Sequence, residues 1–159
     1  MTGNQYRRLI ASYLEAAYGD RGIQVYEEVS LGTSIIGKQR RMDLFVLHVA
    51  SGVGLAVECK YQDSPGTVDE KIPYALQDLR SMRMPGVIVY AGAGFSEGVL
   101  HLLQCAEESA YCLPDAELKP VGRRQGDRID SGTWQLDHVL AQTFRWWDIV
   151  LSERRLYQP

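Results

Sequence analysis

Long hydrophobic runs are missing from this sequence of 159 residues. No apolar stretch approaches the roughly 20 residues that a membrane-spanning helix needs. The opening segment, MTGNQYRRLIASYLEAAYGD, carries charges throughout and has no apolar block of the kind that marks a signal peptide. We therefore expect no membrane partner.

Cysteine and histidine are scarce. The cysteines Cys59, Cys105 and Cys112 are odd in number and lack the spacing of a metal site or a redox motif. This usage favours a reduced, cytoplasmic protein. The three histidines are scattered along the chain, so no Ser/His/Asp or Cys/His catalytic set is predicted.

An excess of positive charge is also missing, since the net charge is -3 and the sequence pI is about 5.6. A strongly basic nucleic-acid binder has a different composition. Two local basic segments remain as candidate nucleic-acid contacts, with the alternative that both are solvated loops. Their residues are Lys38, Arg40 and Arg41 in the first and Arg123 and Arg124 in the second.

The chain is 45% hydrophobic and has no internal repeat, which is typical of one globular domain, here residues 1–159. Hydrophobic periodicity predicts an α/β domain with a mixed sheet and surrounding helices. The expected helices are 5–18, 73–82, 96–109 and a long C-terminal helix over 136–155, and the expected strands are 23–31, 42–50, 55–62 and 86–92. The second helix is placed after Pro73, because proline damages a helix interior, and the preceding Thr67–Glu70 segment is predicted to form a capping box.

The strands 42–50 and 55–62 are predicted to form a β-hairpin that gathers three charged side chains. A turn centred on residues 51–53 places Asp43 opposite Lys60. Because side chains alternate along a strand, Glu58 shares the face of Lys60. A slip of one residue in the register would move Asp43 to the other face.

Two carboxylates and an ammonium group at this separation suit a hard divalent cation. Mg²⁺ binds through one or two carboxylates, retains several waters and contacts substrate phosphate. We predict Asp43 and Glu58 as ligands, with the Cys59 carbonyl as a further one, and Mn²⁺ as a substitute metal. Lys60 would align the attacking water or hold the phosphate. The alternative is a cross-strand ion pair on a solvated face, worth under about 1 kcal/mol.

Met42-Asp43 and Glu58-Cys59-Lys60 resemble the two halves of the PD-(D/E)XK nuclease motif, with methionine in place of the proline. The hairpin and its flanking elements, over roughly residues 5–110, are similar to the αβββαβ core of that restriction-endonuclease-like superfamily. The resemblance implies a Mg²⁺-dependent enzyme that hydrolyses DNA, with Asp43 and Glu58 as metal ligands and Lys60 as the catalytic lysine. The size of the chain, the apolar C-terminal helix and the habit of this family together predict a homodimer, and we expect no organic cofactor.

The same resemblance implies further site residues. Gln62 is predicted to be catalytic, because it matches a polar position that follows the catalytic lysine on the same strand face. Glu15, the only acid in the first helix, is predicted as an accessory residue. Lys71, Tyr74 and Gln77, from the helix after the motif, are candidates to face the site or the substrate, with ordinary helix surface as the alternative.

Two other functions stay open at this point. The acidic composition is compatible with a nuclease-like module that binds nucleic acid or protein without cutting it. The segment GAGFSEG, residues 92–98, is close to a dinucleotide-binding glycine pattern, but its last glycine is one place late. A tight turn between a strand and a helix is the favoured interpretation of this segment.

Overall fold

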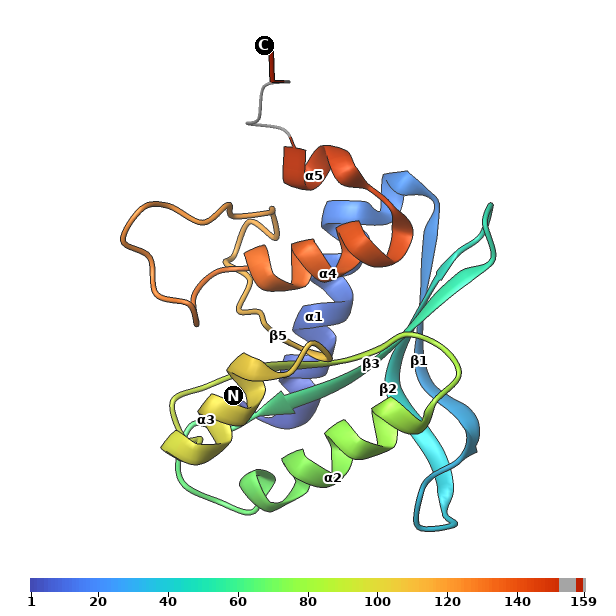
Figure 1. Ribbon diagram of the computed structural model, residues 1–159, viewed down its shortest axis with the longest axis vertical. Helices are drawn as coiled ribbons and strands as arrows, with labels where there is room; N and C mark the ends of the chain where they lie inside the picture. The colour runs from blue at the N-terminus through green and yellow to red at the C-terminus, as the bar shows by residue number, and fades with distance from the viewer. Residues whose placement is uncertain (152–156, 159) are drawn as a thin grey trace.

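The computed structural model describes residues 1–151 and 157–158. A five-stranded sheet in the order β1-β2-β3-β4-β5 forms the centre of the molecule (Figure 1). β1, β2 and β3 form an antiparallel meander, and β4 and β5 add to β3 in parallel. The strands are β1 (Ile23–Thr33), β2 (Gln39–His48), β3 (Val53–Tyr61), β4 (Gly86–Ala91) and β5 (Ser109–Tyr111).

Helices flank the sheet and complete the predicted αβββαβ order, so the expected α/β fold with a mixed sheet is confirmed. Among the described residues, no helix is long and apolar enough to cross a membrane. The helices are α1 (Gly3–Tyr18), the short 3-10 helix η1 (Gly19–Arg21), α2 (Val68–Ser81), α3 (Glu97–Cys105), α4 (Trp134–Phe144) and α5 (Trp147–Leu151).

α1 and α4 cover one face of the sheet, and α2 lies on the other. The hydroxyls of Tyr13 and Tyr18 on α1 donate to the buried Asp137 carboxylate of α4, at 2.5 and 2.6 Å. Tyr6 of α1 packs on Tyr61 of β3, with ring centroids 5.3 Å apart. Since side chains alternate along β3, the odd-numbered residues face α1 and the even-numbered residues face α2.

The hairpin register differs from the predicted one by two residues. Leu44 pairs with Val57, which extrapolates to Asp43 opposite Glu58 and not opposite Lys60. The turn occupies residues 49–52 and ends earlier than the sequence suggested. A shift of two residues preserves the alternation of side chains, so the three charged residues still share a face.

α2 begins at Val68, five residues before the predicted start, and Pro73 lies inside it. The predicted capping box does not form, because Thr67 makes no side-chain capping bond. The Gln62 side-chain oxygen accepts the Val68 N–H instead, at 3.1 Å. A contact from the preceding strand therefore starts the helix, which sequence-local reasoning does not reveal.

The prediction of one continuous C-terminal helix is wrong, because the chain forms two helices, α4 and α5, in this region. α4 ends at Phe144, and Arg145 adopts the left-handed conformation with φ 61°. This reversal turns the Trp146 ring back onto Tyr18 and Phe144, with centroids 5.6 and 4.9 Å apart. The free energy gained by packing the Trp146 indole thus outweighs the free energy that a longer helix would contribute. Residues 152–155 of the prediction lie outside the described residues.

The glycines of segment 92–98 are explained by close packing, and the predicted strand-to-helix turn is confirmed. A Cβ atom at Gly92 would lie 2.2 Å from the Gln62 carbonyl oxygen, and one at Gly94 would lie 2.3 Å from the Ser64 nitrogen. Gly94 N–H also donates to the Gln62 carbonyl at 2.8 Å. The glycines at these positions are needed for the close contact between two loops. This contact explains the glycine pattern without a dinucleotide site.

Candidate active site

The candidate site lies where β2 and β3 separate. Their pairing ends at Leu44 and Val57, although β2 continues along β1 and β3 continues along β4. At the point of separation the Asp43 carboxylate accepts the Cys59 N–H at 2.7 Å. A side chain therefore replaces the backbone partner that Cys59 would otherwise have, and polar groups gather in the opening between the strands.

Glu58 and Lys60 form an ion pair on the α2 face of β3. Their side chains are 21% and 18% exposed, so water reaches them only in part. Burial raises the pKa of Glu58. The Lys60 ammonium lowers this pKa through its positive charge and its hydrogen bond. The nearby Asp43 carboxylate raises the pKa further through its negative charge, whereas a hydrogen bond from the Asp43 backbone lowers it. A carboxylate whose negative charge is incompletely compensated is suited to binding a cation.

The Cys59 main chain points into the same opening. In a strand, the N–H and C=O of one residue face the same neighbouring strand. Because the Cys59 N–H meets Asp43, its carbonyl also faces the β2 side. The Cys59 thiol is buried beside Tyr6 on the α1 face, where burial raises its pKa. The thiol is therefore core, and only the backbone of Cys59 reaches the site.

These groups fit a hard divalent cation. Asp43 and Glu58 supply two carboxylates, and Cys59 supplies a carbonyl, which is the oxygen donor set that Mg²⁺ and Mn²⁺ accept alongside water and phosphate. Within residues 1–151 and 157–158, no group of three or more His, Cys, Asp or Glu side chains is placed to hold a metal ion.

A pocket of about 420 Å³ opens beside this ion pair. Although the whole chain is acidic, the pocket lining holds five basic and two acidic side chains. Positive charge is thus concentrated where a phosphate would meet Glu58 and Lys60. The lining consists of Ser34, Ile36, Lys38, Gln39, Arg40, Arg41, Met42, Glu58, Lys60, Lys71, Tyr74, Ala75, Asp78 and Leu79.

The predicted accessory residues divide into two groups. Lys71 and Tyr74 on α2 line the pocket, as expected for residues that face the site. Gln77 is exposed and does not line it. Glu15 is exposed on α1, nine residues and about 13.5 Å along the helix axis from Tyr6, the residue that touches β3. The structure does not bring Gln77 or Glu15 to the pocket.

Gln62 follows Lys60 on the same strand face, and its side-chain amide is fully engaged within the fold. Its nitrogen donates to Asp69 at 2.9 Å and to the Gly94 carbonyl at 2.8 Å, and its oxygen accepts from Val68. Only 5% of the residue is exposed. These contacts join β3, α2 and the β4–α3 turn, so Gln62 organises the loops beside the site.

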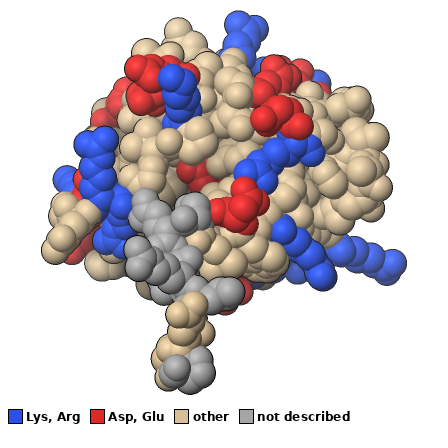
Figure 2. Space-filling view, turned by 90° about the horizontal axis from the view of Figure 1, so that it is seen from above, with Lys and Arg blue, Asp and Glu red and all other residues tan. Residues whose placement is uncertain are grey.

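The basic segments also separate. Lys38 and Arg41 are exposed and line the pocket, although Arg41 forms an ion pair with Glu28 at 3.2 Å. Arg40 lines the pocket as well, but its guanidinium is bound within the protein. Figure 2 shows the end of the molecule that carries α5, where the Lys and Arg side chains of the described residues are interspersed with Asp and Glu.

The second basic segment lies away from the pocket. Arg123 and Arg124 are exposed, but neither lines it. The Arg123 guanidinium lies 5.0 Å from the centroid of the Trp134 ring at the start of α4. The structure therefore does not join the two basic segments into one surface around Glu58 and Lys60.

Sequence reasoning missed the residues that shape the pocket wall. Asp78 accepts two bonds from Arg40 and one from the Ile35 N–H, which ties the β1–β2 connection to α2. Ala75 and Asp78 share a helical face with Lys71 and Tyr74, since they follow at intervals of three and four. That spacing was visible in the sequence, but it does not exclude Gln77, which also follows Tyr74 at an interval of three.

Comparison with known proteins gives one family match and two weak structural likenesses. The family model described as the PD-(D/E)XK nuclease superfamily domain matches residues 2–147. A crystal structure of a protein of unknown function is 16% identical, with a TM-score of 0.43 over 67% of this chain and 57% of the other. A type III CRISPR defence DNA nuclease activated by cyclic oligoadenylate is 16% identical, with a TM-score of 0.46 over 98% of this chain and 21% of the other. No curated protein matched the sequence.

Proposed function

The chain belongs to the PD-(D/E)XK nuclease superfamily, and from that premise we propose that it is a metal-dependent nuclease that hydrolyses phosphodiester bonds in DNA. One observation carries the proposal. Asp43, Glu58 and Lys60 share a face at the separation of β2 and β3, and the last two open into a pocket with an excess of basic side chains. This combination supplies carboxylates that can bind a cation and basic side chains that can bind a phosphate at the same place.

Asp43, Glu58 and the Cys59 carbonyl are the groups that would hold Mg²⁺, with Mn²⁺ as a substitute. When bound, such a metal makes water a better nucleophile and screens charge that develops on phosphorus. The raised pKa of Glu58 supports this assignment, because a partly desolvated carboxylate gains from a neighbouring cation. The Asp43–Cys59 bond fixes one carboxylate at the opening before any ligand arrives.

Lys60 has the position of a residue that orients the reacting groups. Its ammonium already contacts Glu58 and lies in the pocket lining, where it can donate to a phosphate oxygen or to the attacking water. Lys38 and Lys71 lie around the same pocket and would contact neighbouring phosphates of the strand. Such contacts position the backbone without reading its sequence.

Cleavage of a DNA panel tests the proposal. Plasmid, linear duplex, single-stranded and forked DNA are incubated with Mg²⁺ or Mn²⁺ and with wild type, Lys60→Ala or Lys119→Ala. Lys119 is an exposed lysine outside the pocket and serves as the matched control. Metal-dependent products from wild type and Lys119→Ala, but not from Lys60→Ala, are the expected result. Equal cleavage by all three proteins would contradict it.

A module that binds without cutting is the second candidate. Asp43 and Lys60 both make contacts within the protein, which is also what a structural ion pair in an inactive relative would do. The same panel separates the two candidates. DNA binding without products from any protein in either metal would favour the binding module, and metal-dependent turnover would remove it.

A homodimer and a reducing cytoplasmic setting complete the proposal. The dimer is supported by exposed apolar side chains near the C-terminal helices, since Trp147 and Leu151 are 48% and 52% exposed. Sedimentation of the wild-type protein would test it, and a monomer at micromolar concentration would count against it. The setting is supported by three free cysteines, two of them buried.

A further inference from the structure

We propose that the pocket between segment 34–41 and α2 binds one unpaired nucleotide of the DNA substrate, next to the phosphate that is cut. The substrate class is then single-stranded DNA or DNA with a single-stranded end, and not an intact blunt duplex. This inference rests on the proposed nuclease function and deepens it, because it assigns a substrate form to the same site.

The size of the pocket favours a single nucleotide. Its volume of about 420 Å³ lies at the lower end of the roughly 300–1,000 Å³ that small-molecule pockets occupy. A double helix cannot enter such a space, since its major groove alone is about 12 Å wide. A duplex would touch only the rim, and the interior would be left unused.

The chemistry of the lining also fits a base and not a phosphate alone. Tyr74 lies on one wall with 37% of its surface exposed, and Ile36 on the other wall is 60% exposed. Phosphate contacts require neither an aromatic ring nor an exposed isoleucine. Every base presents a flat face that stacks on an aromatic side chain, whatever the sequence. Ala75 and Leu79 extend the apolar surface, and Lys38 and Lys71 supply charge for the backbone.

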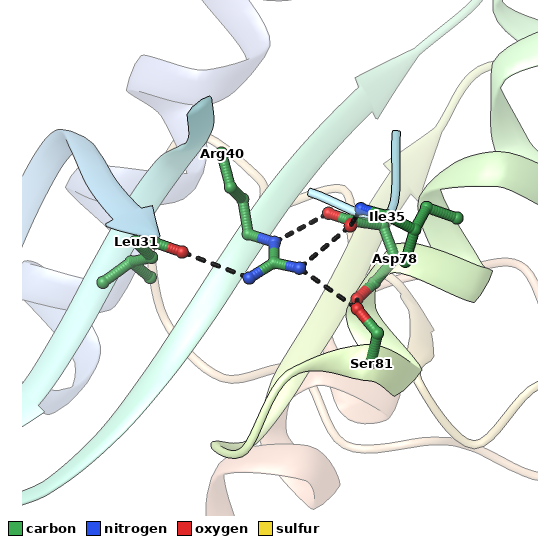
Figure 3. A network of polar contacts seen from close by, with 5 residues as sticks. All are labelled: Leu31, Ile35, Arg40, Asp78 and Ser81. Carbon is green, nitrogen blue, oxygen red and sulfur yellow. Dashed lines mark hydrogen bonds and ion pairs between the residues drawn. The ribbon is translucent and has the colours of Figure 1, made fainter. Parts of the chain in front are cut away.

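The wall formed by segment 34–41 is held in place before substrate binds (Figure 3). The Arg40 guanidinium donates two bonds to Asp78, at 2.8 and 2.9 Å, and one to the Leu31 carbonyl at 3.1 Å. Asp78 also accepts the Ile35 N–H at 3.0 Å. Because both side chains of this pair are 11% exposed, the link between β2 and α2 is shielded from solvent. A pocket with fixed walls loses little conformational freedom on binding.

The position of the pocket connects base binding with cleavage. Glu58 and Lys60 belong to the lining that also contains Tyr74 and Ile36. A base that stacks in this pocket therefore lies in the same cavity as Glu58 and Lys60, within reach of which its own phosphate would be held. Tyr74 is on this view a binding residue, and Arg40 and Asp78 are positioning residues for the wall.

The experiment measures binding separately from hydrolysis. Fluorescence anisotropy in EDTA compares a labelled single-stranded 12-mer with the blunt duplex that it forms with its complementary strand, using wild type, Tyr74→Ala, Tyr74→Phe and Tyr26→Ala. Tyr26 is the matched control, because it is 44% exposed on β1 and does not line the pocket. Cleavage of the same two DNAs with Mn²⁺ is recorded in parallel.

The expected result is tighter binding of the single strand than of the duplex by wild type, Tyr74→Phe and Tyr26→Ala. Tyr74→Ala should weaken single-strand binding about tenfold and leave duplex binding unchanged. Equal affinity of wild type for both DNAs, no effect of Tyr74→Ala, or no binding of either DNA would overturn the inference. Selective binding without cleavage would remove only the nuclease proposal, whereas cleavage that is indifferent to Tyr74 would remove only this inference.

Discussion

Glu58–Lys60 and Arg40–Asp78 are both carboxylate–cation pairs in the lining of one pocket, yet the pKa of Glu58 is raised and the pKa of Asp78 is lowered. Burial is the largest cause of the raised pKa of Glu58, whereas at Asp78 the hydrogen bonds from Arg40 outweigh the effect of burial. The donors around each carboxylate differ. Arg40 and the Ile35 N–H satisfy Asp78, whereas Glu58 pairs with Lys60 alone and lies near a second carboxylate, Asp43, that raises its pKa further.

The difference separates a structural pair from a candidate functional one. Asp78 has its charge met by a guanidinium in two-point contact, which is the strongest form of this interaction, so the pair fastens two elements together. Glu58 has less compensation than its burial requires, and carboxylates with such shifted pKa values are common at functional sites. Two carboxylate–cation pairs in the lining of one pocket can therefore have different roles.

The largest effect should come from Glu58→Gln, which keeps the shape of the side chain and removes its charge. We expect cleavage to fall by about 10²–10³-fold, because the cation loses a ligand. Single-turnover rates on the preferred DNA of the panel would measure this. Asp78→Asn is the contrasting variant, and its loss at a temperature where it is folded should be much smaller. A similar loss in both variants would erase the distinction between the pairs.

The next effect concerns stability. Arg40→Ala leaves the Asp78 charge largely buried and unpaired, and we expect the free energy of unfolding to fall by about 3 kcal/mol. Urea denaturation measures the change. Lys60→Ala should cost clearly less, because Lys60 does not link two elements through a two-point contact. Arg40→Lys sharpens the test, since it restores the charge but not the forked geometry and should recover only part of the loss. A larger loss in Lys60→Ala than in Arg40→Ala would reverse the comparison.

The smallest expected effect is a difference in pH dependence. The pKa of Asp78 is lower in the folded protein than in the unfolded chain, so its stabilising contribution is complete above the unfolded value of about 3.9 and is lost as pH falls. The pKa of Glu58 is higher in the folded protein, so its ionisation costs stability as pH rises from about 4.3 through the folded pKa.

Unfolding free energies across pH check these signs. Relative to Asp78→Asn, wild type should gain stability as pH rises from about 2 to 4. Relative to Glu58→Gln, wild type should lose stability as pH rises above about 4. Slopes of the same sign in the two comparisons would show that the carboxylates are not in different environments.

The face that carries Asp43, Glu58 and Lys60 could be predicted from the sequence because it depends only on the alternation of side chains. The predicted register was displaced by two residues, and this error left the face unchanged. A displacement of one residue would have lost the site. The prediction of the fold was similarly robust, since it rested on the order of strongly periodic elements and not on their boundaries.

What could not be predicted depends on contacts between distant residues. The early start of α2 requires Gln62, and the break at Arg145 requires burial of Trp146 against Tyr18. The role of Arg40 inside the fold requires Asp78, which is 38 residues away. A run of basic letters favours a solvent-facing patch, and only the tertiary structure shows which guanidinium is already bound.

Binding of Mn²⁺ tests the central distinction most directly, because it requires neither a substrate nor turnover. Titration calorimetry would compare wild type, Glu58→Gln and Asp78→Asn at neutral pH. Loss of a residue that only hydrogen-bonds to a metal ligand weakens metal binding by about 10–100-fold, so loss of a direct ligand in Glu58→Gln should weaken it by more than about tenfold. Asp78→Asn should bind as wild type does. Equal Mn²⁺ affinity in all three proteins, or a loss confined to Asp78→Asn, would contradict the assignment of Glu58 as the functional carboxylate.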